Sequence, residues 1–116
     1  MMDGQNNMVD EKVLQQLAKD IGLDNTRKVM DSLESEYQKR INSIRVGIEI
    51  KSLTALTAQA HALKSTAHVS GAYQLAEQLI KLETACNEQN EEAISIARET
   101  LTLAELTSVA YRDIKL

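Results

Sequence analysis

The chain has 116 residues and a formal net charge of -4 at neutral pH, and its 17 acidic and 13 basic residues are interspersed. This length predicts one domain with one function, and the dispersed charge excludes the concentrated positive face that nucleic-acid binding requires. The single cysteine, Cys86, excludes an internal disulfide, and no segment approaches the ~20 consecutive apolar residues of a membrane span. We therefore expect a cytoplasmic protein with no nucleic-acid or membrane partner.

The composition predicts an all-α protein. The chain has no proline, tryptophan or phenylalanine and only 4 glycines, which favours helices and leaves few residues suited to a sheet. We expect a flexible N-terminus over residues 1–8 and a single helical domain over residues 9–116. The first element is a short helix, which Asp10 can cap and which ends at Gly22.

Two further helices are expected in the middle of the chain. The first begins within residues 24–26 and ends near Gly47, and its apolar residues recur at three-, four- and seven-residue steps. Ser52 can cap the second, and the Ser70-Gly71 pair is a credible break after it. The apolar residues of this second helix are Leu53, Leu56, Ala60, Leu63 and Ala67. His61 is therefore expected in the middle of a helix.

The last part of the chain predicts two more helices. The apolar residues of the first are Ala72, Leu75, Ala76, Leu79, Leu82 and Cys86. Asn90 can cap the second, which is expected to open with Glu91 and Glu92, where acidic residues suit the positive end of the helix dipole. Short connections between long helices imply antiparallel neighbours. The sequence thus predicts an antiparallel up-and-down four-helix bundle with an additional short N-terminal helix.

A polar stripe runs along the predicted helix that contains His61. Residues three and four apart share a helix face, and the members of the stripe are His61, Lys64, Ser65 and His68. Among the neighbours of His61 one turn away, only Lys64 is long enough to crowd the ring, since Ala58 and Ser65 are small. A neutral imidazole keeps a lone pair near pH 7, so an exposed histidine can accept a phosphoryl group without a dedicated base.

The run His61-Ala62-Leu63-Lys64, with small residues and then Gly71-Ala72 behind it, resembles the signature of histidine-containing phosphotransfer (HPt) domains. The resemblance extends over nearly the whole chain and is closest to LuxU-type quorum-sensing phosphorelay carriers. It implies that His61 accepts a phosphoryl group and that Lys64, as an exposed cation, stabilises the charge of that group. Most of the family has glycine directly after the lysine, where this chain has Ser65, and this departure bears on how closely a partner can approach.

The resemblance also implies the partners. A receiver-domain aspartate of a hybrid sensor kinase would donate the phosphoryl group, and the aspartate of a response regulator would receive it. The Mg²⁺ would belong to the partner receiver domain, so this chain would be a monomeric carrier without a cofactor or metal and not an enzyme. The 4 glycines are isolated and form no nucleotide-binding loop, so the phosphoryl group must come from another protein.

Five other residues receive expected roles. Ala58, Ser65 and His68 are expected to line the surface that a partner contacts, and Gly71 is expected to allow a turn or the approach of another helix. Glu83 lies where many family members have a glutamine that can touch the imidazole. A carboxylate there could accept the other ring N–H and hold the tautomer, or it could be an uninvolved solvated side chain.

The sequence leaves two alternative functions to consider. A helical adaptor could dock a partner without carrying phosphate, and His61 would then be incidental. A small metal-dependent hydrolase is disfavoured because the chain lacks a cluster of metal ligands. His61 and His68 are seven residues apart, whereas two zinc-binding histidines on one helix normally lie three or four apart.

Overall fold

The computed structural model describes residues 8–116, so most of the N-terminus that was expected to be flexible lies outside the described residues. Within residues 8–116 the chain forms five helices and no strand, which confirms the all-α class. The helices are α1 (Glu11–Ile21), α2 (Leu23–Glu49), α3 (Leu53–Val69), α4 (Tyr73–Asn87) and α5 (Ala93–Arg112).

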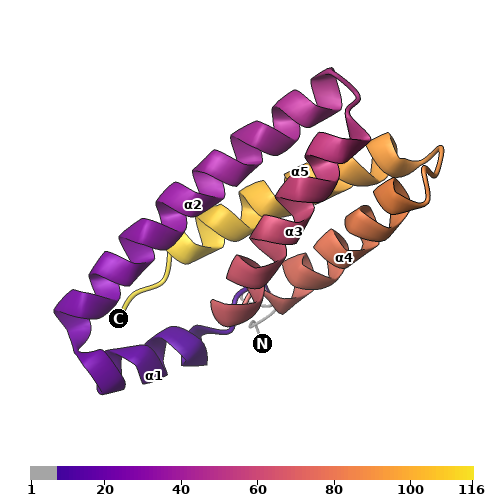
Figure 1. Cartoon of the computed structure of the whole chain (residues 1–116). Helices are drawn as coiled ribbons and strands as arrows, with labels where there is room; N and C mark the ends of the chain where they lie inside the picture. The colour runs from indigo at the N-terminus through magenta and orange to yellow at the C-terminus, as the bar shows by residue number, and fades with distance from the viewer. Residues whose placement is uncertain (1–7) are drawn as a thin grey trace.

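Helices α2 to α5 form an antiparallel bundle (Figure 1). Both α2 and α4 pack against α3 and α5, whereas the diagonal pair α3 and α5 has little contact. Helix α2 has 27 residues and extends beyond its neighbours, and α1 packs against this overhanging part (Figure 1). The predicted four-helix bundle with a short additional N-terminal helix is therefore confirmed.

The core of the bundle is built from leucine, isoleucine and alanine side chains. Helix α3 buries four of the five apolar residues that its sequence predicts, namely Leu56, Ala60, Leu63 and Ala67, and Leu53 is partly buried against the same core. Burial of one leucine side chain contributes about 1.5–3 kcal/mol relative to its exposure, so this stripe fixes the rotation of α3 about its axis. The opposite face of α3 is left free to carry polar residues.

The N-terminal ends of α1 and α3 have the caps that the sequence predicts. The Asp10 carboxylate accepts a hydrogen bond from the Lys12 backbone N–H at 3.1 Å, and the Ser52 hydroxyl accepts one from the Ala55 N–H at 3.1 Å. Each of these side chains satisfies an N–H that has no partner inside its helix. The Ser52 cap fixes where α3 begins, eight residues before His61.

Other helix ends differ from expectation. Helix α2 begins at Leu23, directly after Gly22, and Thr26 lies inside it with its hydroxyl donating to the Gly22 carbonyl at 2.8 Å. The helix also continues past Gly47 to Glu49. A Cβ atom on Gly47 would lie 2.9 Å from Leu56 Cδ2, so this glycine allows α3 to approach α2 and does not end the helix.

The start of α5 is a further correction. The Asn90 side chain accepts a hydrogen bond from the Glu92 backbone N–H at 2.8 Å, but this closes a turn ahead of the helix. Helix α5 begins at Ala93, so Glu91 and Glu92 precede it. Asparagine side chains close such local turns readily, which is why a cap and a turn look alike in sequence.

A buried joint holds the C-terminal end of α3. Gly71 has a φ of +87°, and a Cβ atom there would lie 3.0 Å from the Asp10 carbonyl oxygen. The Asp10 N–H donates to the Gly71 carbonyl at 2.9 Å, and the Tyr111 hydroxyl donates to the Ser70 carbonyl. Burial raises the pKa of Tyr111, so its hydroxyl stays a donor. This joint ties α1 and α5 to the end of the helix that carries His61.

Candidate functional site

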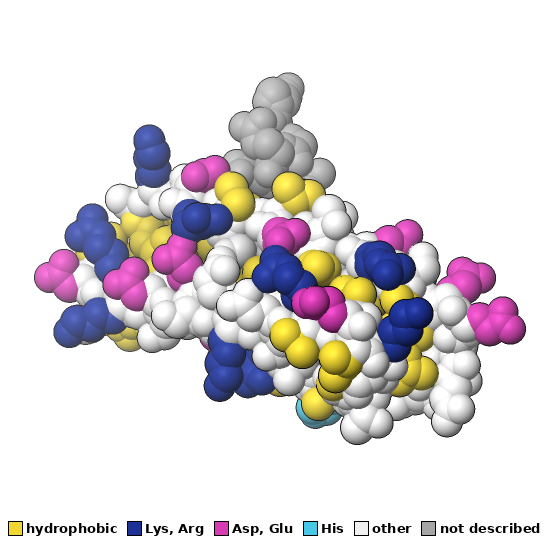
Figure 2. All heavy atoms as spheres, turned by 90° about the horizontal axis from the view of Figure 1, so that it is seen from above, with side chains coloured by type: hydrophobic (Ala, Val, Ile, Leu, Met, Phe, Trp, Pro, Cys, Tyr) yellow, Lys and Arg dark blue, Asp and Glu magenta, His cyan; other side chains and the backbone are white. Residues whose placement is uncertain are grey.

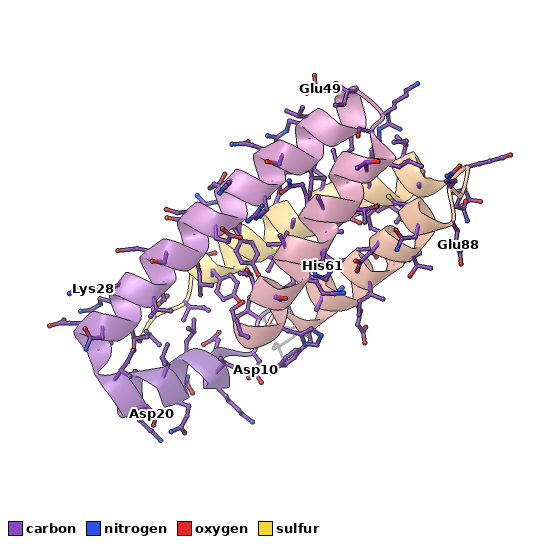
Figure 3. All side chains as sticks on the ribbon, viewed as in Figure 1. Asp10, Asp20, Lys28, Glu49, His61 and Glu88 are labelled. Carbon is purple, nitrogen blue, oxygen red and sulfur yellow. The ribbon has the colours of Figure 1, made fainter. Side chains whose placement is uncertain are left out.

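His61 lies midway along α3 on the face opposite the core (Figure 3). Its side chain is 70% exposed, although its chain neighbour Ala60 is fully buried. The alternation follows from helix geometry, because the residues that anchor α3 in the core leave His61 on the outer side. The ring is thus fixed at its base and open to solvent at its outer edge.

A carboxylate from the neighbouring helix contacts the imidazole. Glu83 of α4 places Oε2 at 3.1 Å from His61 Nδ1, and its Oε1 accepts a hydrogen bond from Lys64 Nζ at 2.8 Å. The side chains of Glu83 and Lys64 are 20% and 26% exposed. One carboxylate therefore bridges both polar residues of α3, and the structure has Glu83 in contact with the ring, not pointing freely into solvent.

The charges define the form of the ring. The Lys64 ammonium holds the pKa of the Glu83 carboxyl below its usual value, so this group is ionised at neutral pH. An ionised carboxylate can only accept hydrogen bonds, so in the neutral ring the hydrogen lies on Nδ1. Nε2 then keeps its lone pair on the solvent side of the ring.

Lys64 differs from its expected setting. The sequence predicts an exposed cation that is free to face a phosphoryl group, but its ammonium is largely shielded and paired with Glu83. Residues 64 and 83 are 19 positions apart on different helices, so their contact depends on the relative position of α3 and α4. The sequence contains no local signal for this pairing.

The other predicted surface residues lie around His61 in different settings. Ala58 and Ser65 are exposed one turn to either side of it on α3. His68 is also exposed, and its ring lies tilted against the ring of Tyr73, with the two ring centroids 6.3 Å apart. Gly71 lies in the buried joint at the end of α3, away from solvent.

The sequence does not predict an apolar groove that the structure shows at the end of α3. It runs between α1, α2 and the end of α3, and the apolar residues that line it are Val13, Leu14, Leu17, Val29, Leu33 and Val69. Val69 is 74% exposed, which makes it the most open large apolar side chain among the described residues. The sequence gives no local signal for this groove, because its lining comes from three different helices.

Other kinds of site find little support in residues 8–116. No group of three or more His, Cys, Asp or Glu side chains in this range is arranged to hold a metal ion. None of the described helices combines the length and apolar character needed to cross a membrane. Figure 2 shows basic and acidic side chains interspersed over the face in view, in line with the charge pattern of the sequence.

Comparisons with known proteins point to one kind of domain. The family model described as the Hpt domain matches residues 28–110, which include His61, Lys64 and Glu83. The crystal structure of histidine-containing phosphotransfer protein B (HptB) from Pseudomonas aeruginosa PAO1 is similar, with a TM-score of 0.78 and 19% sequence identity. The match covers 90% of this chain and 91% of that chain, and it shows a shared fold. Comparison with curated protein sequences gave no match.

Proposed function

Because this chain belongs to the Hpt domain family, whose members act in histidine phosphotransfer in two-component signalling, we propose that it is a phosphorelay carrier. It accepts a phosphoryl group on Nε2 of His61 from a receiver-domain aspartate and passes the group to the aspartate of a response regulator. The observation that carries this proposal is the His61 ring itself, which is 70% exposed and hydrogen-bonded at Nδ1. Nε2 is left as the atom that can attack.

Each transfer step forms one bond to phosphorus and breaks another. The Nε2 lone pair forms a bond to phosphorus while the bond from phosphorus to the aspartyl oxygen breaks, and the aspartate leaves as a carboxylate. Phosphoryl transfer depends mostly on positioning and on neutralising charge, usually with a divalent metal. The partner receiver domain would hold Mg²⁺, so we place the main catalytic apparatus on the partner. This chain is then a carrier, not an enzyme, and needs no cofactor of its own.

The surface around His61 suits a transient partner. Ala58 and Ser65 are small and exposed on either side of the histidine, so a receiver domain could approach the ring closely. The groove beside Val69 adds apolar area toward α1. A footprint of about 800 Å² or less per partner is usual for transient docking. We propose that a cytoplasmic monomer presents this face in turn to a hybrid sensor kinase and to a response regulator.

The test is transfer from a labelled donor to variants of the carrier. With a phosphorylated receiver domain as donor, we expect the wild type to be labelled and His61→Ala to remain unlabelled with an unchanged circular dichroism spectrum. Thr54→Ala changes an exposed side chain of the same helix and should be labelled like the wild type. ATP and Mg²⁺ alone should label neither protein. A labelled His61→Ala would overturn the proposal, and a wild type that binds receiver domains but is never labelled would favour the adaptor.

A further inference from the structure

Three exposed side chains form a patch along the seam between α3 and α4, which lie side by side (Figure 1). The α3–α4 patch consists of His68, Tyr73 and Ile80. Tyr73 and Ile80 are 48% and 45% exposed, and they share one face of α4 because they are seven residues apart. The exposed His68 ring lies 6.3 Å from the Tyr73 ring, measured between centroids. Large apolar side chains gathered on a surface are typical of an interaction site.

The α3–α4 patch adjoins the site at His61. Ile80 lies three residues before Glu83, whose carboxylate contacts both His61 and Lys64. His68 lies seven residues after His61 on the exposed side of α3, a rise of about 10 Å along the helix. A partner footprint of about 800 Å² has a radius of about 16 Å. A partner centred on His61 therefore covers the patch.

Charge is absent from the exposed face of α3. Its exposed side chains are all uncharged, namely Thr54, Ala58, His61, Ser65, His68 and Val69. Lys64 is the only Lys, Arg, Asp or Glu of this helix, and its ammonium is paired with Glu83. Each of the other four helices exposes charged side chains, such as Lys19, Arg27, Lys81 and Arg98. A partner that recognised α3 by charge would therefore find no free counter-charge on it.

The immediate surroundings of the α3–α4 patch add no net charge. Glu77 and Lys81 are exposed beside Ile80 on α4 and carry opposite charges. An interface core is typically poor in charged residues and rich in aromatic and aliphatic ones, with polar groups at its rim. The patch has this composition, with Tyr73 and Ile80 inside and the two charges beside them. Its surroundings thus favour a partner surface that is itself apolar.

We propose that the α3–α4 patch is a second contact surface, on the α4 side of His61, for a receiver domain whose surface beside its aspartate is uncharged and apolar. The inference rests on the proposed function and adds the chemistry of the partner surface to it. The groove beside Val69 lies on the other side of α3, toward α1 and α2. Contact on both sides of α3 centres the partner over His61. Because no charge steers the encounter, binding depends little on ionic strength.

The first test measures binding of a purified, unphosphorylated receiver domain. In NMR titrations, the amide signals of Tyr73 and Ile80 should shift, and Tyr73→Ala and Ile80→Ala should each raise the Kd about fivefold. Leu106→Ala is the matched control, because Leu106 is an aliphatic side chain of α5 with a similar exposure of 49%. An unchanged Kd in both patch variants would overturn the proposal. This readout needs no phosphoryl transfer, so it keeps its meaning if the proposed function fails.

The second test places a charge of either sign on the α3–α4 patch. Both Ile80→Glu and Ile80→Lys should raise the KM for transfer from a phosphorylated receiver domain about tenfold, because each charge would lose water against an apolar surface. Labelling by phosphoramidate and the circular dichroism spectrum should not change. Leu106→Glu and Leu106→Lys are the controls. Opposite effects of the two charges at Ile80, or a KM that changes tenfold with ionic strength in the wild type, would show a charged partner surface and overturn the proposal.

A second copy of this chain is the other occupant that the α3–α4 patch has to be tested against. Light scattering coupled to size-exclusion chromatography should show a monomer for the wild type and for Ile80→Glu at the concentrations used in the transfer assay. A wild-type dimer that Ile80→Glu dissociates would assign the patch to self-association and overturn the proposal.

Discussion

Two polar junctions join helices of this bundle, and they differ in their access to solvent. The site junction consists of His61, Lys64 and Glu83 and lies at the surface between α3 and α4, with the imidazole 70% exposed. The buried joint consists of Ser70, Gly71 and Tyr111 and lies at the end of α3, where all three residues are buried. Both hold α3, but only the first leaves an atom open to react.

The buried joint should matter mainly for stability, and the site junction mainly for the chemistry of His61. When a buried hydrogen bond loses one partner, the other polar group stays buried with neither a protein partner nor water. This costs more free energy of folding than the loss of an exposed hydrogen bond. Substitutions in the buried joint should therefore lower the free energy of unfolding and leave the chemistry of His61 intact. Substitutions in or beside the site junction should impair phosphoryl transfer and leave the free energy of unfolding nearly unchanged.

The largest effect is expected for Ser65→Trp. The new side chain would stand one turn from His61 on the same exposed face, and we expect transfer from a receiver domain to fall about a hundredfold or more, since small misplacements cost that much. Labelling by phosphoramidate, a small donor that needs no docking, should continue. Ser35→Trp is the control, because Ser35 lies beside Arg112 on the side of α2 that faces α5. Full-rate transfer in Ser65→Trp would contradict docking over this face.

The next effect is on stability and concerns Gly71→Ala. Its φ of +87° strains any side chain, and the added Cβ atom would lie 3.0 Å from the Asp10 carbonyl. We expect the free energy of unfolding to fall by about 2–3 kcal/mol in denaturant titrations. Gly22→Ala adds backbone strain without a close neighbour, since Gly22 also has a φ of +87°, with a ψ of 160°, and no atom lies within 4 Å of the new Cβ. An unchanged free energy of unfolding in Gly71→Ala would contradict the close approach of α1.

A smaller loss of stability is expected for Tyr111→Phe. The variant removes the hydroxyl that donates to the Ser70 carbonyl and leaves that buried oxygen with one partner fewer. The expected loss in the free energy of unfolding is about 1–2 kcal/mol, with phosphoramidate labelling of His61 unchanged. Tyr73→Phe removes the hydroxyl of a residue that is 48% exposed and should change the stability by less than about 0.5 kcal/mol. A loss of labelling in Tyr111→Phe would mean that the two junctions are coupled.

The smallest effect is the contribution of Glu83 to stability as a function of pH. Its pKa in the folded protein is lowered, chiefly by Lys64, so the folded state favours the ionised form. This stabilisation is present above the ordinary carboxyl pKa of 4.5 and is lost as pH falls through the lower folded value. The difference in unfolding free energy between wild type and Glu83→Gln should thus shrink in acid, from a neutral-pH value under about 1 kcal/mol. A difference that grows in acid would contradict the pairing.

Much of the fold follows from local patterns in the sequence. The buried stripe of α3 and the Ser52 cap were predicted because helical period and capping depend on residues close together in the chain. Two of the errors concern Gly47 and Asn90, where the local signal has two meanings. A glycine can end a helix or admit another one, and an asparagine can cap a helix or close a turn, and only packing decides between them.

The site was predictable in part for the same reason. The exposure of His61 follows from the period of α3, whereas the link from Glu83 to Lys64 depends on the register of two helices and has no local signal. The sequence therefore allows two interpretations of Glu83 and predicts a free Lys64. The closer resemblance to LuxU-type carriers stays a prediction, as do the roles of Ala58 and His68.

The most direct test of the proposed carrier function is to identify the atom that holds the phosphoryl group. Protein labelled with nitrogen-15 in histidine and phosphorylated by a receiver domain should show coupling between phosphorus and Nε2 of His61, and proteolysis with mass spectrometry should place the modification on the same residue. Nδ1 should still carry its proton, held by Glu83. A phosphoryl group on Nδ1, on His68 or on any other side chain would contradict the account.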